Sequence, residues 1–306
     1  MKAINYGLLL ITSMLWAGNF VASKVAVGYV GPETVAFLRY FIAIIILIPV
    51  VLIQENKFLP PKQSIWPLIG MGFTGVFLFN MLVLMALEHT SATNTGVISA
   101  LNPIAIALLA FIFVKEKLSL RQILGMGIGL VGVLIVITNG DWLRMLELNF
   151  NIGDLYMLLA VLTWGVYSLI IKNAAGDLSP LFITFWSGIF GLFMFVPFTF
   201  KKIYFIQSPD LNFWSSIGYT SIGATVLAML FWNIGVRNVG GTQSGMFLNF
   251  NPIFTALLAF LLLGETLSWP QIWGTIVVIN GVIIYSSKYP TYKITNILTR
   301  FRLGKG

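Results

Sequence analysis

The feature that most constrains this chain is a block of apolar sequence that occurs twice. Residues 96–132 read GVISALNPIAIALLAFIFVKEKLSLRQILGMGIGLVG, and residues 245–281 read GMFLNFNPIFTALLAFLLLGETLSWPQIWGTIVVING. The second copy follows the first by 149 positions without a gap, and about half of the aligned positions from 102 to 135 are identical. This identity indicates a duplication, so the fold and the function have to be explained from the relation between two repeats.

The composition indicates that both repeats lie in lipid. The chain is 58% hydrophobic and 9% charged, whereas soluble domains carry roughly 25% charged residues. A membrane-spanning helix needs about 20 mostly apolar residues, and the apolar runs here are too continuous for the alternating strands of a membrane barrel. We therefore predict an all-α integral membrane protein with ten transmembrane helices, at residues 4–26, 33–53, 66–87, 92–114, 120–138, 152–172, 180–199, 213–235, 241–263 and 270–287.

Five spans per repeat make the second repeat enter the membrane in the opposite orientation. The prediction is thus two inverted five-helix repeats, a common plan of secondary transporters. The expected boundaries are a first repeat at 1–138, a connecting loop at 139–151, a second repeat at 152–288 and a basic tail at 289–306. That tail is either an interfacial helix near anionic lipid or a solvated end.

The distribution of Lys and Arg predicts which way the chain lies. If the N-terminus is cytoplasmic, thirteen Lys and Arg residues lie inside and four outside. Cytoplasmic loops carry such an excess. We expect a multi-pass cell-membrane protein with both termini cytoplasmic, whose first apolar run is a retained span rather than a signal peptide.

Several function classes are excluded by what the chain lacks. There is no Cys and only one His, so no disulfide, thiolate or two-His metal site is expected. No nucleotide-binding motif is present. The ten carboxylates are scattered, whereas an enzyme acting on lipids needs a clustered acid, base or metal set. The net charge of +8 is spread over short loops and the tail, which favours membrane orientation over nucleic-acid binding. We predict no enzyme, no catalytic residue, no metal and no cofactor.

Polar residues inside the spans are the candidates for a substrate site, because unpaired polar groups are costly in lipid. Asn102-Pro103 recurs as Asn251-Pro252 near the middle of spans four and nine. Proline there removes a backbone hydrogen bond, and such broken helices often line the site of inverted-repeat carriers. Pro103 and Pro252 are predicted hinges, with a kink for packing as the alternative. The predicted substrate-binding residues are Trp16, Asn19, Arg39, Asn80, Asn102, Trp164, Tyr167, Asn233 and Asn251.

Each of these residue types also has a structural interpretation. Arg39 either captures a substrate carboxylate, forms an ion pair with Glu33 or Glu88, or extends to the outer surface. Mid-span amides such as Asn80 and Asn233 link helices as well as bind ligands. The equivalent Trp16 and Trp164 either stack on a flat substrate or belong to the lipid-facing and interfacial aromatic belts.

Titratable residues at the span ends are the candidates for proton coupling. Glu88 and His89 close span three, and an interfacial position without a coupling role is the alternative.

The hairpins that follow spans four and nine share a pattern of caps. Ser119 with Gln122, and Ser268 with Gln271, fit capping boxes. Glu116 and Glu265 precede them, and we expect these carboxylates to bond backbone N–H groups, with proton coupling as the alternative. Gly125 and Gly129 have the spacing of close helix packing, either within the chain or at a dimer face. A monomer and a homodimer both fit.

The two five-span halves, the repeated Asn-Pro, the Ala-Leu-Leu-Ala-Phe run and the hairpins KEKLS and GETLS resemble the EamA-type transporters of the drug/metabolite transporter superfamily. The resemblance covers nearly the whole chain. It implies a ten-helix bundle with a cavity between its halves and alternating access. Members are mostly exporters of amino acids, related metabolites or toxic small molecules, often proton-driven. We expect such an exporter, whose partners are a small-molecule substrate and membrane lipid. The alternatives are a facilitator, an exchanger, a channel-like pathway or a non-transporting scaffold.

Overall fold

The structure is a computed structural model that describes residues 2–55, 58–115, 118–141, 150–174, 178–199, 205–239 and 246–286. Glu116, the tail at 289–306, most of the loop at 139–151 and the side chain of Asn233 lie outside the described residues. Apart from one isolated bridge between Val30 and Phe205, the described residues form no β-structure. The prediction of an all-α chain with ten helical spans is confirmed.

The first repeat contributes five of these spans, and two of the five are built from several short helical elements. The continuous spans are α1 (Lys2–Ala26), α2 (Pro32–Gln54) and α7 (Leu120–Ile137). The third span consists of η1 (Lys62–Ser64), α3 (Ile65–Met71), η2 (Gly72–Leu78) and α4 (Phe79–His89). The fourth span consists of α5 (Ala92–Ser99), α6 (Asn102–Leu109) and η3 (Ala110–Val114).

The second repeat has the same order of continuous and interrupted spans. Its continuous spans are α9 (Ile152–Ala174), α10 (Pro180–Thr199) and α15 (Trp269–Ser286). The eighth span consists of α11 (Leu211–Gly218), η4 (Tyr219–Leu227) and α12 (Ala228–Val239). The ninth span consists of η5 (Met246–Phe250) and α14 (Asn251–Leu263). Eight helical segments are long and apolar enough to cross a membrane, and Phe247–Leu263 and Trp269–Tyr285 are shorter apolar helices.

The central interruptions of the third and fourth spans recur in the eighth and ninth spans, whereas η3 has no counterpart in the continuous α14. Both η2 and η4 are π-helical turns, a geometry that is rare and frequent at functional sites. Asn102 and Asn251 each begin a new α-helix, with the proline directly after them in the first turn. Proline is well tolerated there because its missing N–H is not needed. The predicted breaks in spans four and nine are therefore present, while their role as hinges stays a prediction.

The hairpins also repeat in detail. The capping box of Ser119 and Gln122 is formed at the start of α7, and Ser268 and Gln271 exchange the same bonds at the start of α15. Lys115 and Gly264, which are 149 positions apart, both end their helices with left-handed backbone (φ 59° and 68°). Glycine has this conformation without steric cost.

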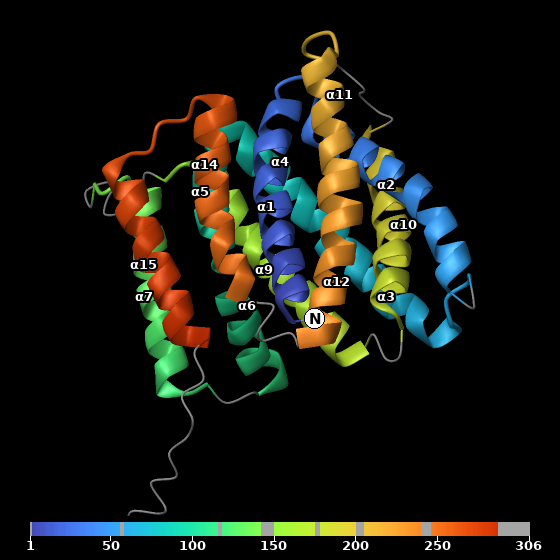
Figure 1. Cartoon of the computed structure of the whole chain (residues 1–306), viewed down its shortest axis with the longest axis horizontal. Helices are drawn as coiled ribbons and strands as arrows, with labels where there is room; N and C mark the ends of the chain where they lie inside the picture. Colours follow the sequence, from blue (N-terminus) through green and yellow to red (C-terminus); the bar gives the residue numbers. More distant parts are fainter. Residues whose placement is uncertain are drawn as a thin grey trace, which may run out of the picture.

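Glycines bring α7 and α15 together along their length, and Figure 1 shows the two helices side by side at one edge of the bundle. A Cβ on Gly125 would lie 2.7 Å from the Gly281 carbonyl oxygen, and one on Gly132 would lie 2.8 Å from that of Gly274. The earlier residue of α7 thus meets the later residue of α15. These equivalent helices of the two repeats therefore run antiparallel, and the predicted close packing is within the chain.

The remaining helices pack in pairs that respect the same symmetry. α1 packs against α12 and α14, and its equivalent α9 packs against α4 and α6. α2 and α10, which are equivalent to each other, are also in contact. This arrangement places the interrupted spans of both repeats around the centre of the bundle (Figure 1).

Candidate functional site

A cavity lies between the two repeats, near the middle of the spans. The empty space within it is about 1020 Å³, part of which is open to solvent, a size compatible with a small metabolite. Both repeats contribute to its wall. The residues that line it are Trp16, Asn19, Phe20, Arg39, Tyr40, Gly75, Val76, Phe79, Asn80, Ser99, Ala100, Asn102, Pro103, Trp164, Tyr167, Thr184, Ser187, Ala224, Thr225, Met229, Leu248, Asn249 and Asn251.

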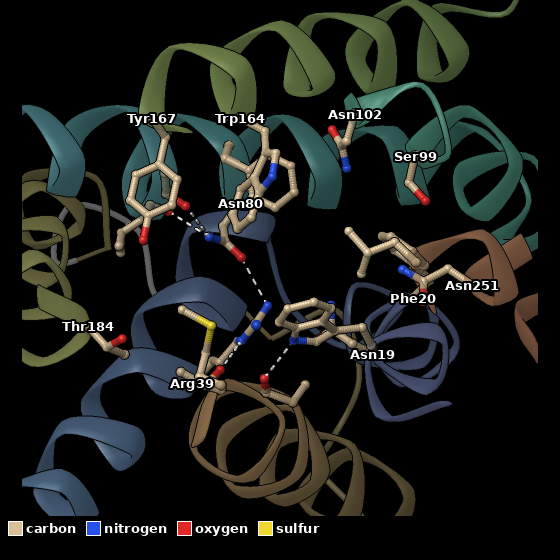
Figure 2. Close-up of a pocket in the computed structure, with 18 of the residues that line it drawn as sticks. Asn19, Phe20, Arg39, Asn80, Ser99, Asn102, Trp164, Tyr167, Thr184 and Asn251 are labelled. Carbon is tan, nitrogen blue, oxygen red and sulfur yellow. Dashed lines mark hydrogen bonds between the residues drawn. The ribbon is translucent and has the colours of Figure 1, made fainter. Parts of the chain in front are cut away.

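Eight of the nine residues nominated from the sequence lie in this wall. They come from six spans that are far apart in the chain, and Figure 2 shows several of them around one space. Asn233, the ninth, has its side chain outside the described residues. Contact of these residues with a substrate stays a prediction. The eight are Trp16, Asn19, Arg39, Asn80, Asn102, Trp164, Tyr167 and Asn251.

Arg39 is buried in the cavity wall without a carboxylate partner in the described part of the chain. Its side chain is 8% exposed. Its Nε donates to Thr225 Oγ1 at 2.7 Å, and its Nη1 donates to Asn80 Oδ1 at 2.9 Å (Figure 2). The alternatives of an ion pair with Glu33 or Glu88, and of extension to the surface, are not realised. A guanidinium held by neutral groups keeps its full charge available to an anion.

The π-helical turn η2 explains why Asn80 presents its oxygen to Arg39. The Asn80 amide nitrogen donates to the carbonyls of Val76 at 2.8 Å and Gly75 at 3.3 Å, and to the Tyr40 hydroxyl at 2.9 Å. These bonds fix the amide so that its oxygen faces the guanidinium. Asn80 therefore acts both as a helix link and as a support of the cavity cation.

Three asparagines in the wall have side-chain oxygens without a partner in the described chain. These atoms are Oδ1 of Asn19, Asn102 and Asn251, and all three are buried. A buried acceptor without a donor costs about 1–3 kcal/mol. A bound molecule that supplies N–H or O–H groups would remove that cost, so the three amides are suited to a ligand with donors.

Aromatic rings supply the apolar part of the wall. Trp164 lies 4.9 Å from Phe79 and 5.0 Å from Tyr167 between ring centroids. The Tyr167 ring occupies the place of a side chain at Gly75, where a Cβ would lie 2.3 Å from a ring carbon. On the opposite repeat, Trp16 donates through Nε1 to the Ala224 carbonyl at 3.1 Å.

Some nominated residues lie away from the cavity. Glu88 and His89 are exposed at the end of α4 and do not line it. Pro252 is buried but is not part of the wall, whereas Pro103 is. Glu265 bonds backbone N–H groups as expected, but these belong to Ala92 and Thr93 of the other repeat rather than to its own hairpin.

Six polar residues of the wall were not nominated from the sequence, and Thr225 and Asn249 are two of them. Thr225 holds Arg39, and its hydroxyl also donates to the Thr220 carbonyl at 2.8 Å within η4. Asn249 lies two residues before Asn251 and is 9% exposed. No sequence signal marked Thr225, because a threonine hydroxyl can bond a carbonyl of its own helix, as it does here with Thr220.

The side chains that face the cavity are of kinds that recognise small molecules. One cation, several amides and aromatic rings face the space, and the described residues contain no group of His, Cys, Asp and Glu that would hold a metal. Such a site can bind a small polar molecule by its charge, its hydrogen-bond donors and its flat surfaces.

Comparisons with known proteins agree with this description. The model of the EamA-like transporter family matches residues 4–138 and 151–287. YyaM, an uncharacterized transporter of Bacillus subtilis (strain 168), is 29% identical over 299 residues, which are 95% of this chain and 97% of that protein. YetK, another uncharacterized transporter of that organism, is 28% identical over 280 residues, 89% of this chain and 85% of that protein.

Two further similarities are more limited. An S-adenosylmethionine/S-adenosylhomocysteine transporter of Chlamydia muridarum (strain MoPn / Nigg) is 25% identical over 156 residues, 51% of this chain and 49% of that protein. A protein crystal structure matches with a TM-score of 0.64 and 17% identity, over 93% of this chain and 98% of that chain. At this identity the match establishes the fold alone.

Proposed function

Because the chain belongs to the EamA-like transporter family, we propose that it is a secondary active transporter that exports amino acids or related small metabolites from the cell. The substrate binds in the central cavity, and the two repeats expose that cavity to each side of the membrane in turn. The antiparallel packing of α7 and α15 supports this proposal, because inverted repeats are the usual basis of alternating access.

The observation that carries the substrate proposal is the buried Arg39 beside unpartnered amides. Its guanidinium would bind a carboxylate, and the oxygens of Asn19, Asn102 and Asn251 would accept hydrogen bonds from an ammonium group. A zwitterion satisfies both demands. Trp16 and Trp164 would stack on a flat side chain. The name of the Chlamydia relative makes S-adenosylmethionine, an amino acid with a flat base, a reasonable member of the substrate panel.

A reconstituted system tests this function. We expect purified protein in proteoliposomes to move a panel of labelled amino acids with saturable kinetics, and Arg39→Gln to lose on the order of tenfold or more in apparent affinity for the carboxylate-bearing substrate. Asn102→Ala and Asn251→Ala should each impair transport at normal expression. Unchanged uptake by both asparagine variants would remove them from the binding site.

The charge of the cavity favours a second candidate, an exchanger. The described wall contains Arg39 and no carboxylate, so the empty carrier would change orientation with an unneutralised buried cation, which is costly. A bound anion would lower that cost. Counterflow with substrate on both sides should then exceed net efflux. Equal rates would favour a facilitator.

We also propose that transport is coupled to protons, which the same proteoliposomes can test. Glu88 and His89 lie outside the cavity, so their coupling would have to act through the end of the bundle where α4 finishes. A pH gradient should accelerate uptake by the parent protein, and Glu88→Gln or His89→Asn should reduce that acceleration. An unchanged response in both variants would exclude them as the coupling groups.

A further inference from the structure

One end of the bundle is held closed by hydrogen bonds between the two repeats. This is the end at which α1, α4 and α14 finish and α5 and α9 begin, the upper end in Figure 1. Residues at and beside the α4–α5 connection bond to two places in the second repeat and to Asn151 just before it. Thr90 Oγ1 donates to Asp154 Oδ1 at 2.6 Å, Asn94 Oδ1 accepts from Gln271 Nε2 at 2.9 Å, and the His89 carbonyl accepts from Asn151 Nδ2 at 2.9 Å.

Glu265 makes the most concentrated of these contacts. Its Oε1 accepts from the Ala92 N–H at 2.9 Å, and its Oε2 accepts from the Thr93 N–H at 3.2 Å and the Thr93 hydroxyl at 2.8 Å. Ala92 and Thr93 are the first residues of α5, whose N–H groups have no partner within the helix. A carboxylate is also favoured at a helix N-terminus by the helix dipole. Glu265 thus caps a helix of the opposite repeat.

A dry layer lies directly below these bonds. Between the cavity wall and this end, α1, α4, α5, α9 and α14 each contribute side chains to one buried apolar cluster. Six of its members, each at most 2% exposed, are Val21, Leu87, Val97, Ile98, Met157 and Ala259. The next residues down α5, Ser99 and Ala100, already line the cavity. Because these side chains are buried between the cavity and the upper end, a path to that side of the membrane requires the layer to separate.

We propose that Glu265 is the latch of this closed end. Its carboxylate holds the start of α5 while the upper end is closed, and it releases α5 when the cavity opens to that side of the membrane. The inference rests on the proposed alternating access. It assigns Glu265 a positioning role, which differs from bonding the backbone of its own hairpin and from proton coupling.

The absence of cysteine from the chain allows a direct measurement. Val97→Cys places a single thiol in the dry layer, where the parent side chain is 0% exposed. A membrane-impermeant maleimide is applied to intact cells and to inverted vesicles. Glu265→Gln turns one acceptor oxygen into an NH₂ group that faces N–H and O–H donors. We expect it to raise the labelling rate of Val97→Cys from the upper face about tenfold or more, as for the loss of hydrogen bonds to a charged group.

Three controls define the outcome. Asp210→Asn makes the same change of charge at an exposed carboxylate of the second repeat at the same end, and it should leave labelling unchanged. Thr93→Val removes one of the three donors and should give a smaller increase. A thiol at the cavity residue Thr184, labelled from the opposite face, should react at the same rate or more slowly.

Unchanged labelling of Val97→Cys in folded Glu265→Gln protein would overturn the latch. Faster labelling of both thiols would also overturn it, because it would indicate general loosening. Labelling does not require transport, so a positive result in a protein that moves no substrate would retain the latch and contradict the transport proposal.

Discussion

At the scale of single residues, the cavity is built around a cation that the protein supports from both repeats. Asn80 of the first repeat and Thr225 of the second each accept a hydrogen bond from Arg39. Neither carries a charge, so they orient the guanidinium without neutralising it. This division of roles predicts that Thr225 affects binding through the position of Arg39.

Thr225→Val removes one of these supports while it keeps the side-chain volume. Hydrogen bonds to charged groups contribute about 1.5–3 kcal/mol, so we expect apparent substrate affinity to fall by roughly tenfold or more, with a smaller change in maximal rate. Thr184→Val is the matched control, because Thr184 also lines the cavity but donates its hydroxyl to the Pro180 carbonyl of its own helix. The kinetics of both variants in proteoliposomes decide the point, and equal effects would contradict it.

The second prediction at this scale concerns the position of the Tyr167 ring, which lies against Gly75. Gly75→Ala adds a methyl group that would overlap the Tyr167 ring, so the ring has to shift, and overpacking of this kind costs about 1–3 kcal/mol. We expect a lower melting temperature and weaker substrate binding. Gly223, 148 positions later in the second repeat, has its nearest neighbour at 3.5 Å and tolerates a Cβ. Thermal unfolding of Gly75→Ala and Gly223→Ala in detergent should separate them; similar melting temperatures would rule out the overlap.

Eight residues of the cavity wall could be predicted from the sequence, because their depth in a span and their position in a repeat are the same in the folded chain. A polar residue far from water must face protein or a wet space, and this argument nominated Asn19, Asn102 and Asn251 without knowledge of any contact. It missed Thr225, because a hydroxyl can satisfy itself on its own helix and therefore gives no signal of a cavity. It left the partners of Arg39 open, because Asn80 and Thr225 lie 41 and 186 positions away in the chain.

At the scale of elements, the duplicated glycines decide how the two repeats join. Gly125 of α7 meets Gly281 of α15, and Gly132 meets Gly274. Each glycine thus contacts the equivalent of the other one, since Gly125 corresponds to Gly274 and Gly132 to Gly281. The sequence showed a Gly-x-x-x-Gly spacing only in α7, and this spacing left a dimer face open. The glycines that form the contact are seven residues apart in both helices. Comparing the two copies position by position, rather than searching for one motif, would have shown it.

A substitution at this crossing should weaken the fold more than one beside it. In Gly132→Leu the Cβ alone would lie 2.6 Å from the Val278 nitrogen, so α7 and α15 have to separate. Gly127, on the same helix, serves as the control, because a Cβ added there would meet nothing within 4 Å. We expect Gly132→Leu to lower the melting temperature and the yield of monodisperse protein, while Gly127→Leu stays close to the parent. Equal stability of the two variants would argue against the crossing.

At the scale of the whole molecule, the ten spans and their interruptions at proline were predictable, because each follows from the length of an apolar run or from a proline within it. The π-helical turns η2 and η4 were not predictable, because their sequences contain no residue that forbids an ordinary α-helix. Contacts between the ends of the two repeats, such as that of Glu265 with α5, also depend on how the repeats dock. Local sequence patterns were enough to predict each helix, whereas the cavity forms only where the two repeats pack against each other.

The orientation of the two repeats in the membrane yields the last prediction. Leu118 and Leu267 occupy equivalent places, 149 positions apart, just before α7 and α15. If an odd number of spans separates them, they face opposite sides, and the excess of basic residues puts Leu118 inside. A single thiol from Leu267→Cys should then react with an impermeant maleimide in intact cells, and one from Leu118→Cys only in inverted vesicles. Labelling of both thiols from the same face would contradict the inverted arrangement, and labelling with the two faces exchanged would retain the inversion and place both termini outside.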